Sequence, residues 1–274
     1  MKDYYQRTAY IKWLNEMGVD YYFSLEKDSK NLVKDINSEK DISLSKIHEN
    51  VPKSKAVGKN NVLDQNNLEI ESRVLANKAS SILELRQIVK NFEGCELKNF
   101  ATNTVFADGI ESAEIMLIGE APGATEDEKG IPFCGESGKL LDNMLAAIGI
   151  SRTKNAYITN TIFWRPPANR KPTDHEISIC RPFVEKHIAL IKPKLIILVG
   201  STATTSLLGK NQGITFIRQN DYPYTNQYLT DAITTTAIFH PAYLLRQPMQ
   251  KKVTWFDLLK IKEKYGDLIA SSPV

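Results

Sequence analysis

Four short apolar runs rich in β-branched residues recur in the second half of the chain, and each is followed by a stretch with helical periodicity. The runs are EIMLIGE, AYITNT, KLIILVG and TTTAIFH, and the helical stretches lie near 137–149, 174–191, 201–208 and 252–266. Strands that alternate with helices are typical of a parallel sheet covered by helices. The pattern predicts an α/β fold with three layers, α/β/α, around a central four-stranded parallel sheet.

The N-terminal part of the chain differs in composition from this region. Residues 1–24 place Tyr10, Ile11, Leu14 and Met17 at helical spacing, which predicts an amphipathic helix. Residues 25–67 are rich in Lys, Asp, Asn and Ser and predict a flexible polar linker. The main domain is then expected over 68–274, opened by a helix near 75–92.

The size and charge of the chain limit the classes of protein to which it can belong. A chain of 274 residues with 42% hydrophobic residues can bury one α/β core and carry an extension. The net charge of +3 is compatible with nucleic acid without demanding it. The sequence has neither a run of about 20 apolar residues nor a secretory signal, so we expect a cytoplasmic monomer without membrane contact. Three widely spaced cysteines do not form a disulfide framework.

Ligands of open α/β sheets bind beyond the carboxyl ends of the strands, so the residues after each run are candidates for function. The first such segment is GEAPGATEDEKGIPFCG. Its glycines allow close approach to a flat ligand, Glu120 and Glu126 supply carboxylates, and Phe133 can present its ring to a base. The alternatives are a Gly-Pro turn with a solvated acidic edge, and core packing of Phe133.

The other three strand ends also offer functional groups. Asn160 carries a planar donor and acceptor pair that matches N3–H and O4 of uracil, although it could equally cap a strand. GSTAT at 200–204 begins a helix whose hydroxyls and N–H groups suit a phosphate, or form a plain N-cap. In FHPAYLLR, His240 ends the last strand, and the leucines and Arg246 are expected on a short projecting loop. A lone histidine is more often structural, but this one converges with three other strand ends.

Together these residues resemble the family 4 uracil-DNA glycosylases, a bacterial and archaeal branch that usually carries an iron–sulfur cluster. The resemblance runs from about Ala79 to Tyr265 and includes NAYITNTIFWRPPANRKPTDHEI, CRPF and HPAYLLR besides the glycine-rich segment. It implies a monofunctional enzyme that hydrolyses the N-glycosidic bond of uracil in DNA and leaves an abasic site, which begins base excision repair. Uracil-containing DNA, double- or single-stranded, is then the expected partner.

The resemblance also implies roles for single residues. The catalytic residues would be Glu120, His240 and Glu126, with Glu120 the better candidate for an essential carboxylate. The uracil pocket would be lined by Gly119, Ala121, Phe133 and Asn160. The DNA contacts, including a wedge at one of the two leucines, would be Ser201, Thr202, Arg165, Arg170, Leu244, Leu245 and Arg246.

The sequence departs from the family at the cluster. Of the four cysteine positions of the family pattern, only Cys95 and Cys180 are cysteines, and Phe92 and Trp164 replace the others. Neither ring can coordinate iron, so we expect no cofactor and hypothesise that the two rings fill the cluster's space.

Two other functions compete with catalysis. The domain could recognise damaged or single-stranded DNA without cutting it, while the N-terminal extension recruits a repair protein. It could also bind a free nucleotide, but the chain lacks the GxxxxGK[ST] and GxGxxG patterns.

Overall fold

The computed structural model describes residues 59–209 and 212–270. The helix expected over 1–24 and most of the linker expected over 25–67 lie outside these residues. The helices are α2 (Lys59–Lys78), α3 (Ile82–Asn91), η1 (Glu96–Asn99), α4 (Ala124–Lys129), α5 (Glu136–Ala146), η2 (Pro167–Asn169), α6 (Asp174–Ile191), α7 (Ser201–Leu208), α8 (Ile214–Ile217), α9 (Pro241–Arg246) and α10 (Gln250–Ala270). The strands are β1 (Asp108–Gly109), β2 (Ile115–Gly119), β3 (Ala156–Asn160), β4 (Leu195–Val199), β5 (Tyr222–Tyr224) and β6 (Ile233–Ile238).

The strands form one sheet in the order β1-β3-β2-β4-β6-β5. The four predicted strands pair in parallel at its centre, and β1 and β5 add antiparallel edges. The central four-stranded parallel sheet is confirmed, and the two edge strands, which were not predicted, extend it to six strands. The edge strands have two and three residues, too few to show a period of two, and β5 contains Pro223, which is tolerated at an edge.

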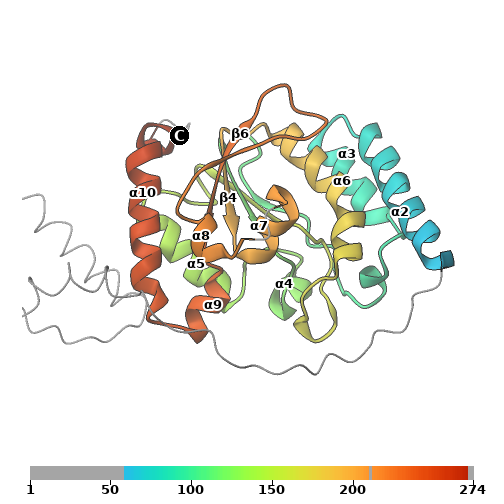
Figure 1. The fold of residues 1–274 in the computed structure, drawn as a ribbon, viewed down its shortest axis with the longest axis horizontal. Helices are drawn as coiled ribbons and strands as arrows, with labels where there is room; N and C mark the ends of the chain where they lie inside the picture. Colours follow the sequence, from blue (N-terminus) through green and yellow to red (C-terminus); the bar gives the residue numbers. More distant parts are fainter. Residues whose placement is uncertain (1–58, 210–211, 271–274) are drawn as a thin grey trace, which may run out of the picture.

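Alternate residues of the central strands face opposite layers of helices. Met116 and Ile118 of β2 join one core with residues of α3, α6 and α7. Ile115 and Leu117 join the other core, with residues of α5, α9 and α10. Figure 1 shows these helices on the two sides of the sheet. The three-layer α/β/α architecture is confirmed, and each described helix is too short or too polar to cross a membrane.

The helices that open the domain differ from the prediction. Helix α2 begins at Lys59, inside the segment expected to be a linker, and lies against α6. The expected helix near 75–92 is broken, because Ser81 caps a new helix by accepting the N–H of Glu84. Hydrophobic periodicity missed the start of α2 because the sequence KNNVLDQNN carries few apolar residues.

The topology places four strand ends at one edge of the sheet. β2 and β4 are neighbours at the centre. The chain continues from β2 to β3 on one side, and from β4 by way of the edge strand β5 to β6 on the other. Such a reversal of strand order opens a crevice at the carboxyl ends of the central strands. Gly119 and Asn160 are register partners there.

Candidate active site

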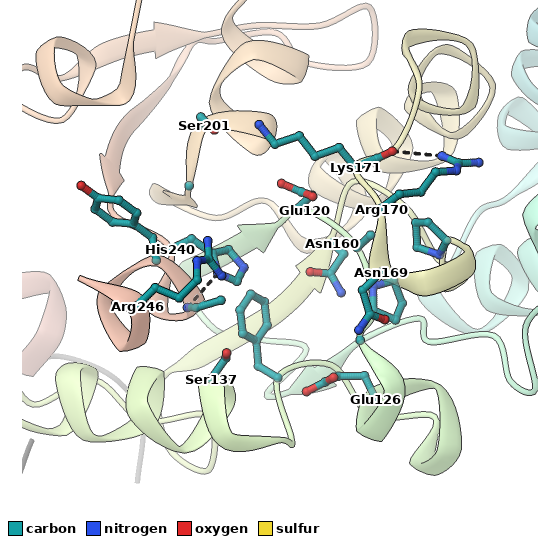
Figure 2. A pocket seen from close by; sticks show the side chains of 18 of the residues that line it. Glu120, Glu126, Ser137, Asn160, Asn169, Arg170, Lys171, Ser201, His240 and Arg246 are labelled. Atoms are coloured by element: carbon teal, nitrogen blue, oxygen red, sulfur yellow. Dashed lines mark hydrogen bonds between the residues drawn. The ribbon is translucent and has the colours of Figure 1, made fainter. Parts of the chain in front are cut away.

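A cavity of about 630 Å³ opens at this edge of the sheet. Residues at the ends of all four parallel strands line it, namely Glu120, Asn160, Gly200 and His240, and Phe133 joins them from the loop before α5. Figure 2 shows the side chains of Glu120, Asn160 and His240 arranged around one space. The expected convergence of the four strand ends is therefore present, and Ala121 also lines the cavity.

Gly119 leaves room for two of the side chains that line the cavity, those of Phe133 and Asn160. A Cβ at Gly119 would overlap the ring of Phe133 and would lie 2.5 Å from Oδ1 of Asn160. Both side chains are buried, at 6% and 1% exposure. Gly119 therefore shapes the site by its lack of a side chain, although it does not itself line the cavity.

Asn160 carries an unpartnered polar atom into the site. Its Oδ1 is buried, and no hydrogen-bond partner for it occurs among the described residues. Buried polar side chains are normally hydrogen-bonded, because an unmade bond costs about 1–3 kcal/mol. The Asn160 amide lines the cavity and has an acceptor without a partner, so it is suited to binding a ligand.

His240 is held in one orientation by the backbone that follows it. Its Nδ1 accepts the N–H of Ala242 at 3.1 Å, so the neutral ring carries its proton on Nε2. Burial, together with the positive charge of Arg246, lowers the pKa of His240 to about 4. Gly200, at φ +94°, leaves room for this ring, since a Cβ there would lie 2.9 Å from the Cβ of His240. The site therefore contains a neutral imidazole that can donate from Nε2.

The two acidic residues have different surroundings. Oε2 of Glu120 accepts a short hydrogen bond from the hydroxyl of Thr202. Oε1 of Glu126 accepts the backbone N–H groups of Cys134 (3.0 Å) and Gly135 (2.8 Å). Glu126 thus binds the loop that carries Phe133, and Thr202, which was expected to meet a phosphate, uses its proton for Glu120 instead.

The predicted DNA contacts divide into two groups. Ser201 and Arg246 are exposed and line the cavity mouth. Arg170 also lines it, but its guanidinium binds Glu176 through two hydrogen bonds of 2.9 and 2.6 Å. Arg165 donates to Asn169 at 2.7 Å. These two arginines brace the loop after β3, although Arg170 is exposed like Ser201 and Arg246.

The segment after His240 is not a projecting loop. Pro241–Arg246 form α9, and the side chain of Leu244 has 0% exposure in the core beneath it. Leu244 is therefore excluded as a wedge in this conformation, and Leu245, half-buried, is the remaining candidate of the pair. Pro241 does not force a turn here but begins α9, because Pro is also favoured in the first turn of a helix.

Sequence reasoning missed several residues that line the cavity. Ser137 and Tyr243 lie within the first turn of α5 and of α9. Tyr243 is three residues after His240, a spacing that places both on one helical face once α9 is recognised. Lys171 and Asn169 come from the segment RPPANRK, in which only Arg165 and Arg170 are predicted as contacts.

The cysteine positions are packed with aromatic rings. Phe92 and Trp164 are buried with ring centroids 6.5 Å apart, and Phe92 packs edge-on against Phe183 at 5.0 Å. Cys95 and Cys180 are both buried, and the neighbouring Cys95 thiol together with burial raises the pKa of Cys180 well above its usual value. Within 59–209 and 212–270, no group of three or more metal-ligating side chains occurs. These residues do not fit a 4Fe–4S cluster, which needs four ligands.

Comparison with known proteins identifies the superfamily to which this fold and this site belong. The sequence profile of the uracil DNA glycosylase superfamily matches residues 106–260, which include all four strand ends at the cavity. The α/β domain and its crevice are thus those of this superfamily.

Individual relatives narrow the class. The type-4 uracil-DNA glycosylase of Sulfurisphaera tokodaii is 38% identical over 188 residues, which are 67% of this chain and 84% of that protein. The type-4 enzyme of Archaeoglobus fulgidus is 38% identical over 174 residues, 63% of this chain and 87% of that protein. That of Saccharolobus solfataricus is 37% identical over 197 residues, 68% and 85% of the two chains. The protein belongs to the type-4 uracil-DNA glycosylase family.

Proposed function

We propose that the protein hydrolyses the N-glycosidic bond of uracil in DNA and leaves an abasic site, which begins base excision repair. The observation that carries this proposal is the buried Oδ1 of Asn160, which has no hydrogen-bond partner among the described residues and adjoins the cavity. An amide that reads the Watson–Crick edge of a flipped base selects uracil by leaving the wrong base unpaired. The names of the relatives support the same reaction.

The proposed reaction uses fixed dipoles rather than a strong base. Cleavage passes through an oxocarbenium-like sugar and a uracil anion. His240, neutral and protonated on Nε2, would donate to O2 of uracil as negative charge develops there. The carboxylate of Glu120, oriented by Thr202, would stabilise the sugar and the attacking water. Phe133 would stack on the base.

DNA is the proposed partner, and the cavity mouth is its proposed entrance. Ser201 and Arg246 are exposed there and would contact phosphates, and Leu245 would act as the wedge. Flipping costs a few kcal/mol, so an already single-stranded substrate is easier to engage. A monomeric state and a repair partner for the N-terminal extension stay predictions.

We also propose that catalysis proceeds without an iron–sulfur cluster. The support is the ring packing of Phe92 and Trp164 at two of the four positions of the family pattern. Purified protein should be colourless and free of stoichiometric iron. A broad absorption near the blue end of the visible spectrum, with bound iron, would contradict this proposal.

The activity is tested with an oligonucleotide that contains one uracil. Incubation followed by alkali should break the strand at that position, whereas binding without breaks would indicate a recognition module. Asn160→Asp should weaken uracil excision and shift relative activity toward cytosine. Asn169→Asp adds the same charge at the cavity edge and serves as the matched control. Unchanged excision by Asn160→Asp would remove this residue from the site.

A further inference from the structure

Phe133, whose ring is the proposed platform for the base, has a strained backbone. Phe133 adopts φ +51°, a left-handed conformation that side chains other than glycine rarely take. Such a conformation persists only where the surroundings over-determine it. The loop therefore needs contacts on both sides of Phe133, and Glu126 supplies those on one side through the N–H groups of Cys134 and Gly135.

Arg152 supplies the contacts on the other side. Its Nη2 donates to the carbonyl of Phe133 at 2.8 Å, and its Nη1 donates to that of Pro132 at 3.0 Å. The remaining N–H groups of the guanidinium bind Asp142 at 2.9 and 3.0 Å and Asp108 at 2.8 Å. All five donors of the side chain are therefore used, and the two carboxylates fix the orientation of the fork.

We propose that Arg152 is a positioning residue of the active site: it holds the Pro132–Phe133 carbonyls and so directs the Phe133 ring into the cavity. Arg152 is largely buried, at 14% side-chain exposure, and is not among the residues that line the cavity. It therefore acts through Phe133 and not on the substrate. The role rests on the proposed function, since the ring is the surface on which the base would stack.

A purely structural salt bridge is the alternative, because Arg152 also joins β1 to α5 through Asp108 and Asp142. The two readings differ in what each partner does. The aspartates are 37% and 45% exposed, and replacing Asp142 by Asn keeps its Oδ1 acceptor while removing the charge. If the guanidinium acts through its bonds to the two carbonyls, Asp142→Asn should lower uracil excision only slightly and Arg152→Met should lower it strongly.

The test compares single-turnover uracil excision by Arg152→Met, Arg152→Lys and Asp142→Asn in the wild-type and Phe133→Leu backgrounds. Arg152→Met should lower the rate by about tenfold or more. Arg152→Lys should also lose activity, because one ammonium cannot reproduce the planar fork. The excision rate of Asp142→Asn should stay within about twofold of the wild-type rate. In the Phe133→Leu background, adding Arg152→Met should lower the rate by less than about twofold further. Affinity for undamaged DNA of the same length should not change.

Two results would overturn the proposal: a wild-type rate for Arg152→Met, or an equal loss with and without Phe133. A readout independent of activity is the NMR spectrum of labelled phenylalanine rings, in which Arg152→Met should shift the signals of Phe133 and leave those of Phe163, on the opposite face of the sheet, unchanged. If the wild-type protein does not excise uracil, the proposed function fails, and unmoved Phe133 signals would separately reject the role of Arg152.

Discussion

The hydroxyl of Thr202 donates a hydrogen bond to Oε2 of Glu120, which joins the first turn of α7 to the end of β2. Hydrogen bonds to charged groups contribute about 1.5–3 kcal/mol, and this one also fixes which carboxylate oxygen is left for a ligand. We therefore expect Thr202→Val to lower kcat for uracil excision by about tenfold with little change in KM.

Thr202→Ser is the matched control, because it keeps the hydroxyl and removes only a methyl group. It should restore most of the activity that Thr202→Val loses. Equal activity of the two variants, measured by steady-state kinetics on a uracil oligonucleotide, would show that the contact with Glu120 does not matter.

The close approach at Gly119 gives a second prediction. Gly119→Ala places a methyl group against the Phe133 ring and Asn160, so the pocket must shift. We expect a loss of about a hundredfold in kcat/KM. Overpacking should lower the free energy of unfolding by about 1–3 kcal/mol, measured by urea denaturation. Gly213→Ala, with no atom within 4 Å of the added Cβ, should leave both quantities nearly unchanged.

Two buried histidines make stability depend on pH. Burial lowers the pKa of His187 to about 3, and that of His240 to about 4, whereas an unfolded histidine titrates near 6.5. Both are neutral when folded, so only the unfolded chain takes up their protons below about pH 6.5. The free energy of unfolding should therefore be fully maintained above this pH and fall as the pH decreases toward 4.

His187 is the cleaner test, because it lies outside the cavity and contacts the Tyr157 hydroxyl at 2.9 Å. Urea denaturation at pH 7.5 and 5 should give a smaller difference for His187→Gln than for the wild type. Each histidine can contribute up to about 1.4 kcal/mol per pH unit in this window. An identical pH dependence in the variant would assign the effect to other groups.

The aromatic packing at the family's cysteine positions should contribute strongly to stability. Phe92 is 2% exposed between Trp164 and Phe183, so Phe92→Ala leaves a cavity and should cost about 3–5 kcal/mol in the free energy of unfolding. Phe216→Ala, at a ring that is 68% exposed, should change it by less than about 0.5 kcal/mol. A small loss for Phe92→Ala, measured by urea denaturation, would mean that this ring does not support the domain.

The central sheet and the strand ends were predictable because short runs of neighbouring residues in the sequence indicate them. Each central strand carries five or six mostly buried residues, and the residues that follow it meet at one edge by the rule for parallel sheets. The helix expected near 174–191 is observed at these bounds, and in the structure Thr173 and Glu176 form a capping box at its start.

What the sequence did not reveal depends on contacts between distant residues. Arg152 and the Phe133 carbonyl are linked only in the folded chain, and nothing in the spacing of the two residues indicates it. The role of Thr202 has the same origin, because its donor bond crosses from α7 to β2. Leu244 was misplaced because a Pro after His240 can begin a helix as readily as a turn.

The order of the strands has a consequence for how the enzyme comes into being on the ribosome. β2, which presents Glu120, lies at the centre of the sheet, but His240 follows β6, the last strand to be synthesised. A nascent chain that ends before β6 has the base platform and the amide but no imidazole. The protein therefore gains its complete set of reactive groups only when nearly the whole domain has been translated, and products truncated before His240 should not excise uracil.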